Sequence, residues 1–184
     1  MFRRVALTFA ALLLALPAMA GELVGITLPE TTTVNDTKLV LNGMGLRKKL
    51  WVKVYVGAIY VTAKSSDPAT LIAADEPKQM VMHFLYEVDV AKLVEAWKEG
   101  FAGNSADKMA ALQQRLDQFC GLWRTMKVGE QAKMTYSPGF GTKLEIGGQE
   151  VGLIIGKDFA DALFAVWLGG KPPSEDLKKG VLGR

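Results

Sequence analysis

Residues 41–61, LNGMGLRKKLWVKVYVGAIYV, constrain the fold of this chain more than any other stretch. From residue 50 onwards the segment is rich in β-branched and aromatic residues, which predicts one long strand over residues 50–62. Gly43 and Gly45 precede it and indicate a bulge or a tight bend. Because a strand this apolar has to be buried, the chain must build a sheet with a second layer packed against it.

The two faces of this strand differ in chemistry, since successive side chains point to opposite faces. Even positions from 46 to 58 are apolar except for Lys48 and are expected to pack into the core. The opposite face is cationic with two amphipathic aromatics, because the odd positions hold Arg47, Lys49, Trp51, Lys53 and Tyr55. A bulge between residues 47 and 50 would break this parity.

The cationic face has two interpretations. In the first it is simply solvated, because long basic side chains often lie across a sheet with their charged heads in water. In the second it lines a pocket, where Arg47 grips a carboxylate through its planar guanidinium and Tyr55 donates a second hydrogen bond. A helix above the face would supply apolar walls for an amphipathic acid. Lys53 and Trp51 are further candidate contacts in that pocket.

The first 20 residues have the composition of a secretory signal peptide. Arg3 and Arg4 form a basic start, residues 5–16 are almost uninterruptedly apolar, and residues 18–20 match an A-x-A cleavage site. The apolar run of about a dozen residues is shorter than the roughly 20 that span a membrane. We expect cleavage after Ala20, a periplasmic or secreted product with no integral membrane span, and one domain over residues 21–184. An uncleaved anchor is the alternative.

The mature chain carries little net charge and few reactive side chains. Cleavage removes two arginines and no acidic residue, which lowers the net charge from +3 to +1. A net charge this small excludes an overall electrostatic attraction of the chain to nucleic acids or membranes. Cys120 is the only cysteine and lies in an apolar helical stripe, which indicates a buried, inert thiol. The single histidine, His83, has no ligand cluster or nucleophile beside it, so we assign no metal and no cofactor.

The remaining patterns place strands at both ends of the chain and helices between and after them. Extended segments are expected at residues 23–28, 38–42, 78–86, 131–137, 143–146 and 150–155, with a turn at residues 34–37. Helices are expected at residues 69–74, 90–101, 109–123 and 159–167, with Asp67, Asp89 and Asp158 as caps. Residues after Gly170 form a short tail. This order favours an α+β fold over a parallel α/β sheet.

Three segments resemble the chalcone isomerase-like family in its bacterial exported branch. They are the opening segment, FLYEVDVAKLVEAWKEGF, and GLIIGKDFADALFAVWLGGKPPSEDLKKGVLG, which is the most specific. With the residues between them they cover essentially the whole mature chain. The resemblance implies an open-faced β-sandwich, in which a layer of helices covers a large antiparallel sheet and a ligand cleft lies between the two.

The resemblance implies two different uses of that cleft. Plant enzymes of the family cyclise chalcones to flavanones, and their G-x-G-x-R turn corresponds to residues 43–47, with the arginine polarising the substrate oxyanion. Their strand threonine falls on Tyr55, and a further hydroxyl residue falls on Gln149. Their Tyr-x6-Asn pair is absent, since Leu93 stands seven residues after Tyr86. Non-catalytic members bind fatty acids through a strand arginine and a tyrosine, which Arg47 and Tyr55 match.

We therefore expect an exported, non-catalytic binding protein for a small amphipathic carboxylate such as a fatty acid. The second hypothesis is an intramolecular lyase of the chalcone isomerase type, in which Arg47 would be catalytic. The third is a structural or interaction module with a closed cleft. No nucleic-acid partner is expected under any of the three.

Overall fold

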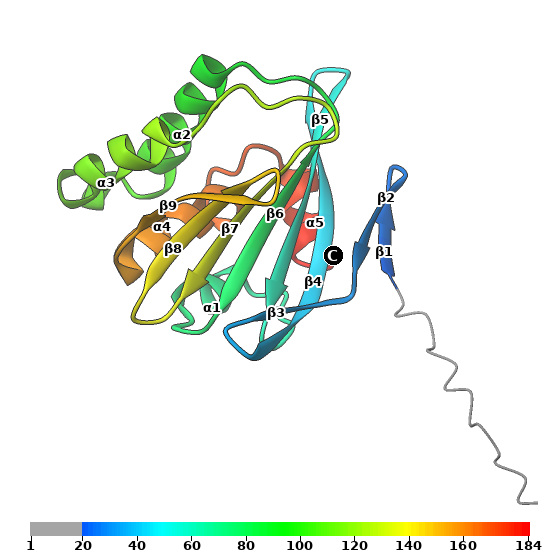
Figure 1. Ribbon diagram of the computed structural model, residues 1–184, viewed down its shortest axis with the longest axis horizontal. Coiled ribbons are helices and arrows are strands. Elements are labelled where there is room, and N and C mark those ends of the chain that lie inside the picture. Colours follow the sequence, from blue (N-terminus) through cyan, green and yellow to red (C-terminus); the bar gives the residue numbers. More distant parts are fainter. Residues whose placement is uncertain (1–19) are drawn as a thin grey trace, which may run out of the picture.

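Seven antiparallel strands form one curled sheet in the computed structural model, which describes residues 20–184 (Figure 1). The strands lie side by side in chain order: β3 Thr31–Val34, β4 Thr37–Lys49, β5 Val52–Val61, β6 Lys78–Phe84, β7 Gln131–Ser137, β8 Gly141–Ile146 and β9 Gln149–Ile154. A separate hairpin is built from β1 Ala20–Leu23 and β2 Ile26–Pro29. Residues 1–19, which hold nearly all of the predicted signal peptide, lie outside the described residues.

The helices form a layer against this sheet. They are α1 Pro68–Ala73, α2 Val90–Asn104, α3 Met109–Gly121, α4 Lys157–Leu168 and α5 Glu175–Val181, with a 3-10 turn at Ala106–Lys108. Helix α4 is the centre of the layer, because it contacts the other four helices and buries most of its side chains. The predicted α+β class with an antiparallel sheet is confirmed. No helix in residues 20–184 is long and apolar enough to cross a bilayer.

Strand β5 is buried on both faces, which differs from the predicted division into an apolar and a cationic face. Tyr55 and Ile59 belong to the main core between sheet and helices. Ala58 and Tyr60 belong to a smaller core on the other face, which the β1–β2 hairpin covers. The Tyr60 hydroxyl donates a 2.7 Å hydrogen bond to the carbonyl oxygen of Pro29 in that hairpin. The solvated-face interpretation therefore fails for the inner half of the strand.

The predicted single strand over residues 50–62 is wrong at its start. β4 continues to Lys49, Leu50 and Trp51 make a two-residue turn, and β5 begins at Val52. A turn of this length normally contains Gly, Asn or Asp, and none is present here. Leu50 instead adopts the left-handed conformation, with φ of 55°. As a result the basic residues before the turn and those after it lie on two neighbouring strands.

Gly43 and Gly45 do not end a strand but make room for a helix. β4 runs through both glycines, and the predicted bulge is confirmed by a register shift between Leu41 and Gly43. A Cβ atom on Gly45 would lie 2.3 Å from the carbonyl oxygen of Leu177 in α5, and one on Gly43 would lie 2.2 Å from that of Gly180. The predicted tail is therefore a helix whose backbone rests directly on β4.

Two of the predicted helix caps are confirmed and one is wrong. The side chains of Asp67 and Asp89 accept backbone hydrogen bonds at the starts of α1 and α2. Asp158 lies inside the first turn of α4, where its two carboxylate oxygens bind the Arg115 guanidinium at 2.7 and 2.6 Å. The predicted first strand is also wrong, because Val24 and Gly25 turn the chain between β1 and β2.

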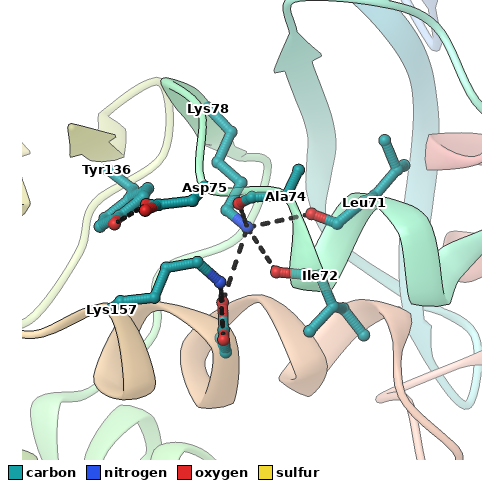
Figure 2. A network of polar contacts seen from close by, with 8 residues as sticks. Leu71, Ile72, Ala74, Asp75, Lys78, Tyr136 and Lys157 are labelled. Carbon is teal, nitrogen blue, oxygen red and sulfur yellow. Dashed lines mark hydrogen bonds and ion pairs between the residues drawn. The ribbon is translucent and has the colours of Figure 1, made fainter. Parts of the chain in front are cut away.

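A buried cation ties α1 to the sheet and to α4 (Figure 2). Lys78 is only 2% exposed, and its ammonium group donates hydrogen bonds to the carbonyl oxygens of Leu71, Ile72 and Ala74 at 3.0, 2.6 and 3.1 Å. These carbonyls end α1 and would otherwise lack partners. The Asp161 carboxylate lies 3.8 Å away. Burial lowers the pKa of Lys78 to about 8, which leaves it charged at neutral pH.

Candidate functional site

A cavity of about 710 Å³ opens between the outer end of the β4–β5 hairpin, helix α2 and helix α4. This volume falls in the range of roughly 300–1,000 Å³ that is typical of small-molecule sites. Its walls are mainly apolar and come from β5, β6, α2 and α4; they include Val54, Phe84, Leu93, Trp97, Val166 and Trp167. The cleft is open, which argues against the closed interaction module.

The hairpin brings Arg47 and Tyr55 together at this cavity. The two residues are direct partners in the β4–β5 ladder, immediately before a register shift, and both line the cavity. The Arg47 guanidinium donates to the carbonyl oxygen of Lys48. Within residues 20–184 it forms no ion pair. Its planar group therefore keeps hydrogen-bond donors for an anionic ligand.

The Tyr55 hydroxyl accepts a hydrogen bond from helix α4 and keeps its own proton available for donation. Its side chain is buried, and its hydroxyl oxygen accepts a 3.1 Å hydrogen bond from the indole Nε1 of Trp167. Burial raises the pKa of Tyr55 to about 12, against the opposing effects of the Trp167 hydrogen bond and the Arg47 charge. The hydroxyl is therefore neutral at physiological pH, and its own proton remains to be donated.

The two further candidate contacts, Lys53 and Trp51, are not among the residues that line the cavity. Trp51 is 85% exposed at the hairpin turn, and the Lys53 side chain is also exposed. Lys49 and Leu50 line the cavity instead. Trp51 lies in the turn itself. Lys53 is displaced by the register shift between Arg47 and Lys48, which leaves Val54 without a partner on β4 and breaks the alternation between Lys53 and Tyr55.

The sequence placed Trp167 only at the end of the helix expected over residues 159–167, with no sign of a connection to the site. It lies 112 residues from Tyr55 along the chain, and no local pattern links the two. Only the packing of helix α4 over the sheet brings Trp167 to Tyr55. Trp167 therefore enters the site as a consequence of tertiary packing.

Apart from Arg47, the positions that the resemblance implies for plant-type catalysis are not all matched here. Leu93 stands where the enzymes have asparagine and forms part of the apolar wall, while Tyr86 is 55% exposed at the rim. Gln149 lies at the start of β9 and is not a cavity residue.

Cys120 is buried in α3, where burial raises the pKa of its thiol. The described residues contain no cluster of three acidic, histidine or cysteine side chains that would hold a metal.

The fold and the cavity together define a domain in which helices cover an antiparallel sheet beside a mainly apolar cavity, and comparison with known proteins places it in a family. The sequence model of the chalcone isomerase-like family matches residues 20–183, so the chain belongs to that family. A solved structure with the same fold is a fatty-acid binding protein from Arabidopsis thaliana, AtFAP1. It superposes with a TM-score of 0.69 at 16% sequence identity over 89% of this chain and 96% of that chain. No curated protein sequence matches at a significant level.

Proposed function

We propose that this protein is an exported, non-catalytic binding protein for a small amphipathic carboxylate such as a fatty acid. The observation that carries the proposal is the pairing of Arg47 with Tyr55 at a cavity whose walls are mainly apolar. Membership of the chalcone isomerase-like family and the shared fold with a fatty-acid binding protein support it.

The two ends of the ligand would contact different parts of the cavity, one polar and one apolar. The carboxylate would take charge-assisted hydrogen bonds from the Arg47 guanidinium and the neutral Tyr55 hydroxyl. The hydrocarbon chain would lie against the wall that includes Leu93, Trp97 and Val166. Each methylene group removed from water there contributes about 0.8 kcal/mol, so affinity should increase with chain length until the cavity is full.

The same geometry disfavours the isomerase hypothesis. Arg47 is present, but the cavity is lined by Leu93 where the enzymes have asparagine. Tyr55 is a poor general base, because its pKa of about 12 is far from the operating pH. A chalcone turnover assay that gives a rate no faster than buffer would agree with this conclusion.

Export rests on the sequence of residues 1–20, which have the organisation of a cleaved leader. We expect the cell to deliver a chain that begins at Gly21 in the periplasm or the medium. The intact mass of the protein purified from that compartment tests cleavage after Ala20 directly.

Native mass spectrometry of gently purified protein tests the binding function. We expect a retained acidic ligand, and we expect Arg47→Ala to weaken fatty-acid binding by about 1.5–3 kcal/mol through loss of the charge-assisted contact. Lys53→Ala is the matched control, since it removes a cation from the same hairpin but outside the cavity. Absence of any retained acid, together with unchanged fatty-acid binding by Arg47→Ala, would overturn the proposal.

A further inference from the structure

The tip of the β4–β5 hairpin exposes two large apolar side chains. Leu50 is 80% exposed and Trp51 is 85% exposed, the highest fractions among the exposed large apolar residues of the described chain. The hairpin also extends past its neighbour, because the β5–β6 ladder begins only at Tyr55 (Figure 1). The tip is therefore a protruding apolar point rather than part of a packed surface.

The local structure of this tip is unfavourable for a turn that serves only to reverse the chain. Leu50 occupies a left-handed position, φ 55°, where glycine or asparagine would be less strained. The exposed indole and isobutyl groups are also costly in water. Departures from local preference of this kind concentrate at functional sites.

The apolar tip is surrounded by positive charge. Lys48, Lys49 and Lys53 are exposed on both sides of the turn, and no acidic residue occurs between Asp36 and Asp67. A wedge of Trp and Leu flanked by lysines matches the boundary of an anionic bilayer, where indole rings lie at the headgroup level and ammonium groups contact lipid phosphates.

The tip is continuous with the ligand cavity. Lys49, Leu50 and Val52 line that cavity from the hairpin side, and Tyr86 lines it from the chain between β6 and α2. The backbone amides of Leu85 and Tyr86 both donate to the carbonyl oxygen of Val54, which fastens this chain segment to the hairpin. Glu87 and Asp89 also line the cavity, and the Asp89 carboxylate caps α2. Lys92 and Lys171 line the cavity from α2 and from the chain after α4, and Lys92 is paired with Glu95. The hairpin therefore supplies one cationic side of the mouth.

We propose that the β4–β5 hairpin docks this protein on an anionic lipid surface. Leu50 and Trp51 enter the headgroup region, the lysines contact lipid phosphates, and the cavity mouth then faces the bilayer. The contact is peripheral and reversible, because two side chains bury little area in the bilayer. Docking does not depend on a ligand in the cavity, so its test and the test of the proposed function give independent results.

Tryptophan fluorescence follows this docking without a label. The chain has four tryptophans, and Trp97, Trp123 and Trp167 are buried, so Trp51 is the one whose surroundings change at a surface. The full chain is expressed and the protein is used as the cell delivers it. With vesicles of phosphatidylcholine and phosphatidylglycerol we expect a blue shift of the emission and quenching by brominated acyl chains. Phosphatidylcholine alone should give a much smaller shift, and added salt should reverse docking.

Variants outside the cavity separate the apolar and the electrostatic contributions. Trp51→Ser should reduce vesicle partitioning, measured by co-sedimentation, by about tenfold. The double variant Lys48→Gln, Lys53→Gln should reduce it by about tenfold or more. Because these three residues do not line the cavity, fatty-acid binding in solution should not change.

Matched controls change the same chemistry elsewhere on the surface. Phe140→Ser removes an aromatic side chain that is 68% exposed in the turn between β7 and β8. Lys98→Gln, Lys127→Gln removes two exposed charges from α2 and the loop after α3. Both controls should partition like the unmodified protein.

Absence of a Trp51 shift with anionic vesicles, or an equal loss in the controls, overturns the proposal. Tight binding to heparin without vesicle binding would assign the tip to an acidic macromolecule and overturns it too.

Discussion

Arg47 and Tyr55 face each other across the β4–β5 ladder, and the Tyr55 hydroxyl is in turn held by Trp167. Cross-strand partners project to the same side of a sheet, so the charge and the hydroxyl reach one cavity from two strands. The tryptophan occupies the acceptor side of the hydroxyl and leaves its proton for a ligand. Three residues from two strands and a helix are thus connected at one cavity.

Tyr55→Phe should weaken both ligand binding and folding. The ligand loses one donor, and the buried Trp167 indole loses its acceptor, which costs about 1–3 kcal/mol of unfolding free energy. Denaturant titration and fatty-acid displacement measure the two effects. In a double-mutant cycle with Trp167→Phe, the stability losses should be non-additive, because the indole that lacks a partner is no longer present.

Tyr60→Phe is the control for this prediction. It removes a hydroxyl from the same strand, but on the face that the β1–β2 hairpin covers. Fatty-acid affinity should be unchanged in this variant. Equal losses of affinity in Tyr55→Phe and Tyr60→Phe would mean that the tyrosine at the cavity acts only through stability.

Gly45→Ala should destabilise the protein by about 2–3 kcal/mol, since its Cβ would lie 2.3 Å from the Leu177 backbone and force α5 away from β4. Gly121→Ala is the matched control, because its Cβ would meet no atom within 4 Å at the end of α3. That change should be neutral or slightly stabilising. Chemical denaturation compares the two variants, and a smaller loss in Gly45→Ala than in Gly121→Ala would contradict the packing of α5.

Lys78 should make the stability of the protein depend on pH in the alkaline range. Its pKa falls from 10.5 to about 8 on folding, so between these values the unfolded chain binds more protons than the folded one. The free energy of unfolding therefore rises with pH across this window, by on the order of 3 kcal/mol relative to a chain without the group. Urea titrations of the unmodified protein and Lys78→Met at pH values spanning the window measure this difference.

Two further comparisons test the Lys78 network itself. At neutral pH, Lys78→Met should lower the unfolding free energy by about 1–3 kcal/mol, because the α1 carbonyls lose their partner. Lys157→Met removes the other cation bound to Asp161 and leaves Lys78 in place. It should retain the alkaline rise. A rise of the same size in Lys78→Met would assign the pH dependence to other groups.

Cys120 should be unreactive in the folded protein, since the side chain is buried and its thiol pKa is raised. Modification by a disulfide reagent should be slow under native conditions and complete within the mixing time in denaturant. Cys120→Ala should bind fatty acid like the unmodified protein. Rapid native modification would place the thiol at an accessible surface and contradict the buried stripe of α3.

The pattern of the sequence predicted most elements but missed the features that depend on contacts between distant segments. Asp67 and Asp89 cap their helices through residues two or three positions away, and a local pattern is enough to find them. The turn at Leu50 and Trp51 has no turn residues, so its position is visible only in the pairing of Lys49 with Val52. The missed turn misplaced Trp51, and the register shift between Arg47 and Lys48 moved Lys53 off the face of Tyr55.

The sequence by itself determined the α+β class, most of the strands and helices between residues 67 and 168, and Arg47 and Tyr55 as the residues to examine. These conclusions rest on periodicity, capping and motif spacing, which are properties of neighbouring residues. The tertiary structure decided that Arg47 and Tyr55 are cross-strand partners, that Trp167 orients the hydroxyl, and that the cavity is open. It also showed that Gly45 admits α5. Each of these depends on which distant segments share a surface, because packing brings together groups that no local pattern relates.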